Sequence, residues 1–529
     1  MEVPLLVTDF LRRAVKLYPA QEAVVNGDLR LNYAQFGARV NQLANALTAL
    51  GVVKGDRVAI LSPNSHQFLE VLYATATIGA AAVPINYRLI GADFEYILNH
   101  SGAKVAIVDS DHAAAVHGLR DAIPSLAHCI TVRFQTDERL PNWHDYEALL
   151  AAQPTTPPPD PGLAESDLLS INYTSGTTAR PKGVMITHRN AYINAYNAIA
   201  HWRISQHDRE MWTLPMFHAN GWGGPYAITA MGGSHIVLRK VEGPAIYQML
   251  QDERITFACM APAVLATILE FPHKAEYDIK TKPRFVVAGA PPPQTFIQRL
   301  EAELGWEFIQ IYGLTETSPI LTISEIKPHL QLQGEAYYRT KARAGQEVIG
   351  ADVRIFGADG DEVPWDDESV GEVAARSNVV LEGYWEQPEE TAKVIRDGWF
   401  FTGDMATVNT DGYINIVDRA KDVIISGAEN ISSLEIEDIL YKHPAVLEAA
   451  VIGVPSQKWG ETPMAIIVPR EGATPTSEDI IAHCRDNMAH FKTPSRVEFV
   501  EALPRTATGK LKKFELRDQY WQGQTRRVN

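Results

Sequence analysis

The sequence predicts an α/β protein whose large N-terminal domain contains two doubly wound sheets, followed by a small β-barrel-like subdomain and a small, mobile α+β C-terminal domain. Two observations carry this prediction. From Arg57 to about Leu304, short apolar runs alternate with helical segments, as parallel sheets with right-handed crossovers require. From about Gly345 the pattern changes to short β segments with turns, and Asp418 introduces a last α+β unit.

The first sheet is predicted from three short apolar runs, separated by helices that we expect from Ser62–Asn64 to about Gly79 and near residues 92–99. These strands are Arg57–Leu61, Ala82–Ile85 and Lys104–Val108. The proline-rich stretch 153–162 cannot be helical. We expect it to link two sheet-forming halves.

The second alternating series begins after a buried strand at Leu168–Asn172 and a helix that starts at about His188. Its strands are Met211–Leu214, His235–Leu238, Thr256–Met260 and Phe285–Ala288, and its helices are near 244–252, 262–270 and 293–304. Ligands in such folds bind beyond the carboxyl ends of the strands. The polar and aromatic segments expected at those ends are Pro215–Trp222, Gly289–Pro291 and Tyr312–Thr317.

A phosphate-binding loop is predicted at residues 173–183, which we name the phosphate loop. It holds four Ser/Thr hydroxyls, two glycines, Arg180 and Lys182. Glycines let the backbone approach a ligand, hydroxyls and amides donate to anionic oxygens, and the cations neutralise charge. The segment does not fit the Walker pattern. The alternative interpretation is a flexible Ser/Thr/Gly surface loop.

The last third of the chain is expected to form β segments at 352–356, 371–376 and 413–417, then the final α+β unit. In that unit Ser432–Glu435 is a capping box that opens a helix to about Lys442. Strands at 447–452, 464–468 and 496–499 and a helix at 477–490 complete it. The tail carries Lys510 in a loop after Thr508 and Gly509. By itself such a lysine is more often solvated than catalytic.

Composition excludes several function classes. A net charge of −16 without a Lys/Arg run disfavours nucleic acid and anionic membranes as partners. The three cysteines are far apart, which argues against a zinc site or disulfide framework. The longest apolar region, Val71–Ile85, contains Pro84 and predicts a buried helix and strand, not a transmembrane segment. With neither a signal layout at the start nor a peroxisomal address at the end, we expect a cytoplasmic protein.

Seven motifs together resemble the adenylate-forming superfamily, which includes acyl-CoA synthetases, peptide-synthetase adenylation domains and beetle luciferases. The resemblance extends from about Leu31 to Leu516. In order, the motifs are the phosphate loop, Phe217–Trp222, Tyr312–Glu316, Thr402–Asp404, Asp418–Asp422, Ser426–Ser432 and Thr508–Lys510.

The resemblance implies a two-step reaction. A carboxylate attacks the α-phosphate of ATP with Mg²⁺, and the thiol of coenzyme A then displaces AMP from the acyl-adenylate. An anion attacks an anion, so catalysis must come from positioning and charge neutralisation. The implied phosphate-binding residues are Thr174, Ser175, Gly176, Thr177, Thr178 and Lys182. The implied adenosine-site residues are Gly289, Ala290, Tyr312, Gly313, Asp404 and Arg419.

The resemblance also implies the catalytic set. Glu316 would bind Mg²⁺, Thr315 would contact the α-phosphate, and Lys510 would bridge the substrate carboxylate and that phosphate. The substrate residues would be His218, Asn220, Trp222, Gly223 and Gly289, with His218 also counted as catalytic.

A rotating C-terminal domain is the remaining implication. The hinge would be Lys421, which divides the chain into an N-terminal domain (1–418), a hinge (419–421) and a C-terminal lid domain (422–529). Rotation would present the segment around Gly427 to the pantetheine. Ala179 and Ala428 replace glycines usual in the family. Ala179 affects the expected geometry of the phosphate loop, and Ala428 affects the expected width of the tunnel for the thiol.

The expected substrate is a medium- to long-chain fatty acid, which would place the enzyme in lipid metabolism. Phe217–Trp222 resembles the variant of aliphatic acyl-CoA synthetases, and Gly223 and Gly224 would leave an opening for an acyl chain. The alternatives are a small aryl or short branched acid, or a ligase that loads a carrier protein. Luciferase-like oxygenation and a non-catalytic acyl- or nucleotide-binding protein are less favoured, and a homodimer is left open.

Overall fold

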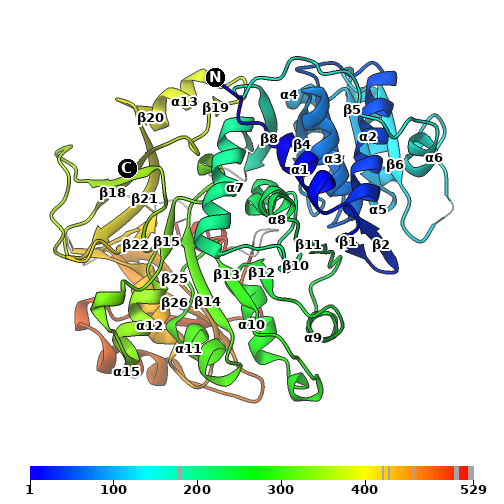
Figure 1. Ribbon diagram of the computed structural model, residues 1–529. Helices are drawn as coiled ribbons and strands as arrows, with labels where there is room; N and C mark the ends of the chain where they lie inside the picture. Colours follow the sequence, from blue (N-terminus) through cyan, green and yellow to red (C-terminus); the bar gives the residue numbers. More distant parts are fainter. Residues whose placement is uncertain are drawn as a thin grey trace.

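The computed structural model describes residues 1–136, 138–174, 180–419, 422–426, 429–456, 459–505 and 511–521. Among these residues the strands form four sheets, of which two are large and mostly parallel (Figure 1). The prediction of two doubly wound sheets is therefore confirmed.

The first large sheet has eight strands and contains the three runs predicted near the N-terminus. In spatial order they are β19 (Gly383–Tyr384), β9 (Lys182–Thr187), β8 (Leu168–Thr174), β4 (Ala81–Ile85), β3 (Arg57–Leu61), β5 (Val105–Asp109), β6 (His128–Val132) and β7 (His144–Asp145). Only β9 runs in the opposite direction, because it pairs antiparallel with both β8 and β19 and the other pairs are parallel.

The proline-rich stretch 153–162 does not link the two sheets, so that prediction is wrong. Strand β7 precedes the stretch and β8 follows it, and both belong to the first sheet. The reason is that β8 pairs in parallel with β4, so the chain returns to the middle of the sheet that it has just left.

The second large sheet has nine strands and receives its last two from the start of the chain. In spatial order they are β16 (Gln346–Glu347), β15 (Thr322–Ser324), β14 (Glu307–Tyr312), β13 (Arg284–Val287), β12 (Phe257–Met260), β10 (Arg209–Met211), β11 (Ser234–Ile236), β1 (Glu22–Asn26) and β2 (Leu29–Asn32). Since β1 pairs in parallel with β11, the N-terminal segment ties the two halves of the domain together.

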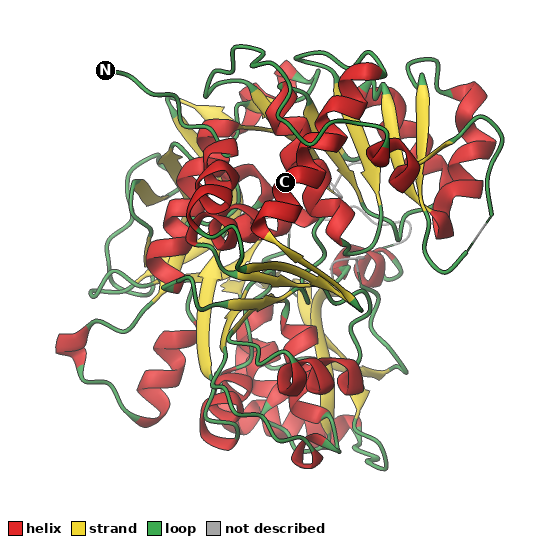
Figure 2. Ribbon diagram, turned by 45° about the vertical axis from the view of Figure 1, so that its right-hand side comes forward, coloured by secondary structure: helices red, strands yellow, loops and turns green. Residues whose placement is uncertain are grey.

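Most helices lie on the outside of the sheets, as Figure 2 shows. Those of the N-terminal part are α1 (Thr8–Leu17), α2 (Tyr33–Ala49), α3 (His66–Ile78), α4 (Gly91–Ser101), α5 (Ser110–Leu119), α6 (Tyr146–Ala151), α7 (His188–Trp202), α8 (Gly224–Met231), α9 (Gly243–Asp252), α10 (Pro262–Glu270), α11 (Gln294–Glu303), α12 (Gly334–Ala342) and α13 (Pro388–Val394).

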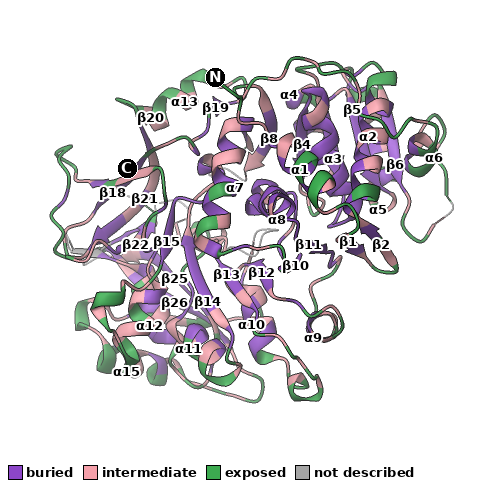
Figure 3. Ribbon diagram, viewed as in Figure 1, coloured by how far each residue is buried: buried purple, intermediate pink, exposed green. Residues whose placement is uncertain are grey.

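Helices α7 and α8 are exceptional because they lie between the two large sheets (Figure 1). One apolar core joins residues of both sheets to both helices. Residues Gly224–Ala230 of α8 are all buried (Figure 3), which suits a helix that is apolar or small on every side. The segment that joins β10 to α8 is therefore fixed at both ends, by the second sheet and by the buried helix.

The third sheet is antiparallel and bulged, so the β subdomain is a distorted sheet. Its strands are β17 (Ala351–Phe356), β18 (Gly371–Ser377), β21 (Trp399–Val408), β20 (Ile395–Arg396) and β22 (Ile414–Arg419).

The fourth sheet and three helices form the C-terminal unit. They are β23 (Ile424–Ser426), β24 (Glu429–Ile431), β25 (Val446–Ser456), β26 (Gly460–Pro469), β27 (Arg496–Phe499), α14 (Ser433–Tyr441), α15 (Ser477–Asn487) and α16 (Lys513–Asp518). The side chain of Ser432 accepts from the Glu435 N–H, so the serine half of the predicted capping box is formed.

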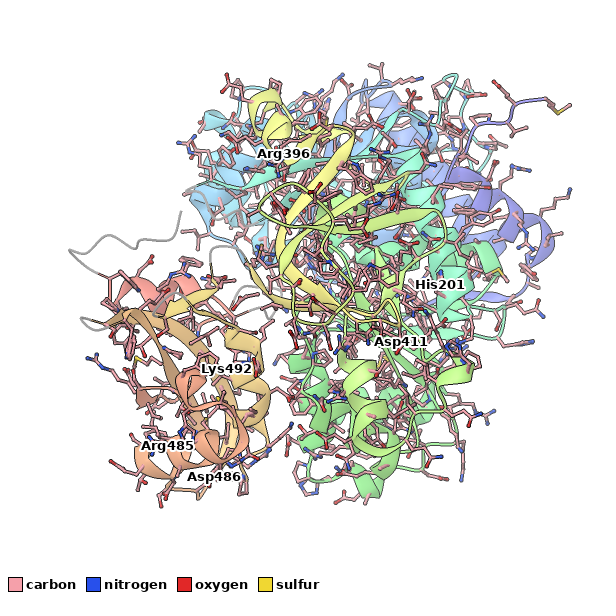
Figure 4. The ribbon with its side chains drawn as sticks, turned by 90° about the vertical axis from the view of Figure 1, so that its left-hand side faces the viewer. His201, Arg396, Asp411, Arg485, Asp486 and Lys492 are labelled. Carbon is pink, nitrogen blue, oxygen red and sulfur yellow. The ribbon has the colours of Figure 1, made fainter. Side chains whose placement is uncertain are left out.

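The C-terminal unit packs against α10 and α11 of the second sheet. The rings of Phe296 and Tyr441 lie 6.0 Å apart, and Arg470 pairs with Glu270 at 3.3 Å. In Figure 4 this unit carries Arg485 and Lys492 and stands beside the green part of the chain. None of the described helices is long and apolar enough to cross a membrane.

Candidate active site

The phosphate loop closes a β-hairpin. Thr174, the last residue of β8, is the register partner of Lys182, the first residue of β9. Strand β9 was not predicted, because its short run follows the loop directly. Ser175, Gly176, Thr177, Thr178 and Ala179 lie outside the described residues. The structure therefore positions the two ends of the loop, and with them Lys182.

Lys182 is connected to Glu316 through Tyr384. The Lys182 ammonium lies 4.9 Å from the centre of the Tyr384 ring, and the Tyr384 hydroxyl donates to Oε1 of Glu316 at 3.0 Å. Because β19, which contains Tyr384, pairs with β9, this tyrosine is fixed beside Lys182. The structure thus brings together a lysine and a carboxylate that are 134 positions apart in the sequence.

Two residues of this cluster were missed by the sequence prediction. One is Tyr384, whose pKa is raised above its ordinary value by burial and by the Glu316 carboxylate, so its hydroxyl remains a donor. The other is Glu390, which accepts from Lys182 at 2.5 Å and also pairs with Lys393. Hydrogen bonds from these two lysines lower the pKa of Glu390 to about 2. The only signal in the sequence was the aromatic pair after Gly383.

A second cluster joins Tyr312, Asp404 and Arg419. The Tyr312 hydroxyl donates to Oδ2 of Asp404 at 2.7 Å, and Nε of Arg419 lies 3.3 Å from Oδ1. Asp404 and Arg419 are register partners on β21 and β22, so the ladder itself brings them together. Burial and the Asp404 charge raise the pKa of Tyr312 well above its ordinary value, which keeps the hydroxyl protonated. The arrangement presents a carboxylate beside an aromatic ring, as a ribose and a purine base require.

Two glycines of the predicted adenosine site have backbone reasons to be glycine. Gly289, which Ala290 follows, adopts φ +96°, where a side chain is strained. A Cβ on Gly313 would collide with the carbonyl of Pro319. Gly313 separates Tyr312 from the single 3₁₀ turn Thr315–Thr317, so the close approach sets where Thr315 and Glu316 lie relative to the ring.

The segment Ala219–Gly223 has a left-handed backbone. All five of its residues have positive φ, from 40° at Ala219 to 84° at Gly223. For residues other than glycine this conformation costs roughly 1–2 kcal/mol each, and such strain concentrates at functional sites. Neighbours hold the segment, since Asn220 donates to Oγ of Ser170 at 2.7 Å. His218 precedes the segment and is half-buried.

The prediction of an opening past Gly223 and Gly224 is wrong. A Cβ on Gly223 would collide with the side-chain amide of Asn194, and one on Gly224 would lie 2.8 Å from both carboxylate oxygens of Glu210. The room that two missing side chains create is filled by polar side chains from α7 and β10. The glycines permit this packing, and the argument for a long acyl chain loses its support.

Comparison with known proteins identifies the family. The model of the AMP-binding enzyme family matches residues 11–385, and that of the AMP-binding enzyme C-terminal domain matches residues 435–510. The chain belongs to the AMP-binding enzyme family. It is an AMP-forming acyl-CoA synthetase, which confirms the resemblance stated above.

Three similar proteins are all CoA ligases. The chain is 37% identical to "4-hydroxybutyrate--CoA ligase 2" of Metallosphaera sedula, over 96% of this chain and 93% of that protein. It is 35% identical to "Trans-cinnamate:CoA ligase, peroxisomal" of Petunia hybrida, over 98% and 94%. The crystal structure of the anthranilate CoA ligase AuaEII in complex with anthranoyl-AMP matches with a TM-score of 0.90 and 26% identity, over 98% of each chain.

In this AMP-binding enzyme the predicted hinge residue Lys421 and the catalytic loop with Lys510 lie outside the described residues, as do Gly427 and Ala428. Their flanks are described. Asp418 accepts from the Ser433 hydroxyl at 2.5 Å, and Asp422 pairs with Arg517 of α16 at 2.5 Å. Both sides of the predicted hinge are thus bonded to the C-terminal unit, and one of them to the helix that follows the predicted catalytic loop.

A buried ion pair supports the same region. Lys513, the first residue of α16, lies 2.8 Å from Oε1 of Glu437 and donates to the Ser433 hydroxyl. Burial acts to lower the pKa of Lys513, but the Glu437 and Asp418 carboxylates outweigh it and raise the pKa. Because α16 begins three residues after Lys510, this pair anchors one end of the predicted catalytic loop.

Proposed function

We propose that this enzyme joins a short-chain or aryl carboxylic acid to coenzyme A, with ATP as the energy source and Mg²⁺ as the metal. The observation that carries the proposal is the contact chain from Lys182 through Tyr384 to Glu316. It joins a cation suited to phosphate oxygens to a carboxylate suited to Mg²⁺, 3.0 Å from the tyrosine hydroxyl. Adenylation needs both charges at one polyphosphate.

The residue roles follow from charge and contact. Lys182 and the phosphate loop would hold the β- and γ-phosphates, and Thr315 would contact the α-phosphate. Asp404 would accept from the ribose hydroxyls, with its carboxylate oriented by Tyr312 and Arg419. Lys510 would neutralise the charge that develops between the acid and the α-phosphate.

Glu316 fits a magnesium ion that is shared with a nucleotide. No group of three or more potential metal ligands occurs among the described residues. Mg²⁺ commonly uses one or two protein carboxylates together with substrate phosphates, so a single glutamate is enough. When bound, the ion would neutralise phosphate charge. The Tyr384 hydroxyl orients the glutamate that would hold it.

The proposed acid class rests on the relatives and on the packing past Trp222. The names of the three similar ligases reported above refer to 4-hydroxybutyrate, trans-cinnamate and anthranilate, which are small acids. Asn194 and Glu210 fill the room beside Gly223 and Gly224. The medium- to long-chain fatty acid predicted from the sequence is the second candidate. A carrier protein in place of coenzyme A is the third.

A substrate panel tests the proposal. Pyrophosphate release would be measured with butanoate, 4-hydroxybutanoate, cinnamate, anthranilate, octanoate and palmitate, with and without coenzyme A, and acyl-CoA would be quantified. We expect turnover that requires coenzyme A and is fastest with a small acid. Preference for palmitate would contradict the acid class, and single-turnover release unaffected by coenzyme A would contradict the acceptor.

Glu316→Gln tests the metal role. The variant should require a higher Mg²⁺ concentration for half-maximal pyrophosphate release and show a lower kcat. An unchanged Mg²⁺ titration would remove Glu316 from the metal site.

A further inference from the structure

Glu210 is a buried carboxyl group that lacks a hydrogen-bond partner. It lies on β10, in the interior of the second sheet (Figure 1), and is 1% exposed. Neither of its carboxyl oxygens has a partner among the described residues. Buried carboxyl groups in proteins are normally paired or hydrogen-bonded. Glu210 therefore lacks the partner that a buried carboxyl group needs, as far as the described part of the chain extends.

Two polar neighbours of Glu210, His235 and Asp208, already have other partners. His235 is its register partner on β11, but one ring nitrogen of His235 accepts from the Trp212 indole at 3.3 Å and the other lies 2.9 Å from Oγ1 of Thr229. Burial lowers the pKa of His235 to about 3, so this ring is neutral. Asp208 pairs with Arg284 at 2.7 Å. No cation or donor is left to serve Glu210 from its own strand or from β11.

Glu210 lies against the segment that carries the candidate acyl site. Its two oxygens are 2.8 Å from the position that a Cβ on Gly224 would take, and Gly224 directly follows the strained segment Ala219–Gly223. On the other side, the Asn194 amide occupies the room beside Gly223 and donates to the Trp222 carbonyl at 3.3 Å. Two polar side chains thus lie directly beside the two glycines that follow Trp222.

We propose that Glu210 closes the distal end of the acyl site and hydrogen-bonds a hydroxyl group at the far end of a short acid. This inference rests on the proposed function and narrows it to a short ω-hydroxy acid. The Glu210 side chain occupies space, which limits chain length. Its unpaired oxygens would form a hydrogen bond with a distal hydroxyl group, so that both groups gain a partner. A methyl group in that position would leave the carboxyl unpaired. Burial raises the pKa of Glu210 well above its ordinary value, so a neutral carboxyl could both donate and accept.

The experiment compares three Glu210 variants on four acids. kcat/KM would be measured for butanoate, 4-hydroxybutanoate, hexanoate and octanoate with Glu210→Gln, Glu210→Leu and Glu210→Ala. The wild type should favour 4-hydroxybutanoate over butanoate at least tenfold and discriminate against octanoate. Glu210→Gln should keep both properties. Glu210→Leu should keep the length limit and lose the preference for the hydroxyl. Glu210→Ala should lose both and gain at least tenfold on octanoate.

Met211→Leu is the matched control, because Met211 is the next residue of β10, is also buried and belongs to a different apolar cluster from the one that contains α7 and α8. Its substrate profile should equal that of the wild type, and calorimetry would show that each variant is folded. An unchanged profile in folded Glu210→Ala, or no preference for the hydroxyl in the wild type, would overturn the inference while leaving a short- or aryl-acid ligase intact. Absence of pyrophosphate release with every acid, aryl acids included, would overturn the proposed function itself.

Discussion

The Nζ atom of Lys182 lies 2.5 Å from Oε2 of Glu390, so the lysine proposed to bind phosphate is paired with a carboxylate of its own chain. The two residues are on β9 and α13, and their side chains are 19% and 29% exposed. A phosphate that uses Lys182 must compete with Glu390. The pair therefore has a consequence for nucleotide affinity.

Glu390→Gln should lower the KM for ATP by up to about fivefold, the scale of one partly exposed ion pair. kcat should change little, because the competition acts on binding. Steady-state kinetics at two salt concentrations checks this, with a smaller effect expected at high salt. Glu389→Gln is the control, since Glu389 is exposed on the same helix. Equal effects of both variants would show that only the total charge matters.

Asp404→Asn should raise the KM for ATP by about tenfold or more with a smaller change in kcat, because ribose contacts are made in the ground and transition states alike. Tyr312→Phe should shift KM in the same direction but less, since it removes the hydroxyl that orients Asp404 and keeps the ring. Initial rates at varied ATP measure both. A fall in kcat at unchanged KM would contradict a ribose role.

Lys510→Ala should reduce pyrophosphate release by roughly 10²-fold or more, the effect of losing one positioned charge in the transition state. The thiolation of supplied acyl-adenylate should largely survive, because the proposed domain rotation removes Lys510 from the second step. Separate assays of the two half-reactions check this, with Lys512→Ala as the neighbouring control. Equal losses in both half-reactions would contradict the rotation.

Lys513→Met should destabilise the C-terminal unit by about 3–5 kcal/mol, because it leaves the buried Glu437 carboxylate unpaired. Calorimetry should show an earlier unfolding transition. Lys512→Met is the control, since Lys512 is 33% exposed and forms an ion pair with Glu515 of α16, which is 40% exposed. A Lys513→Met, Glu437→Leu double variant should recover much of the loss.

Glu210→Gln should change the pH dependence of stability. Burial raises the pKa of Glu210 well above the ordinary 4.5, so above that pH the folded protein holds a proton that the unfolded chain releases. The folded wild type therefore loses stability as the pH rises from about 4.5 towards the folded pKa, by up to about 1.4 kcal/mol per pH unit. The variant should equal the wild type near pH 4 and exceed it at pH 8, as Tm values across pH would show. Parallel Tm curves would contradict the raised pKa.

Much of the fold was predictable because its signals are local. Strands β3 and β5 and helix α10 follow from runs of apolar residues and prolines that a short window contains. Strand β9 was missed because its run follows the phosphate loop without a turn signal. The pairing of β1 with β11, and of β8 with β4, depends on edges that are made by distant parts of the chain, and no local pattern specifies which edge is free.

The candidate site divides in the same way. The phosphate loop, Glu316 and Asp404 were found because each belongs to a contiguous motif with the chemistry that its ligand needs. Tyr384 and Glu390 were missed because their importance comes from Lys182, about two hundred positions earlier, and arises only when β19 pairs with β9.

The sequence by itself determined the phosphate loop and, through the resemblance that its ordered motifs carry, predicted an enzyme that uses an acid, a nucleotide and a thiol, because each motif is a contiguous run of residues. Only the tertiary structure decided what fills the room beside Gly223 and Gly224. A glycine in the sequence shows only that a side chain is absent. The neighbouring side chains that fill the space come from other elements of the fold. Here they are Asn194 of α7 and Glu210 of β10, whose polar side chains occupy the space of the expected opening.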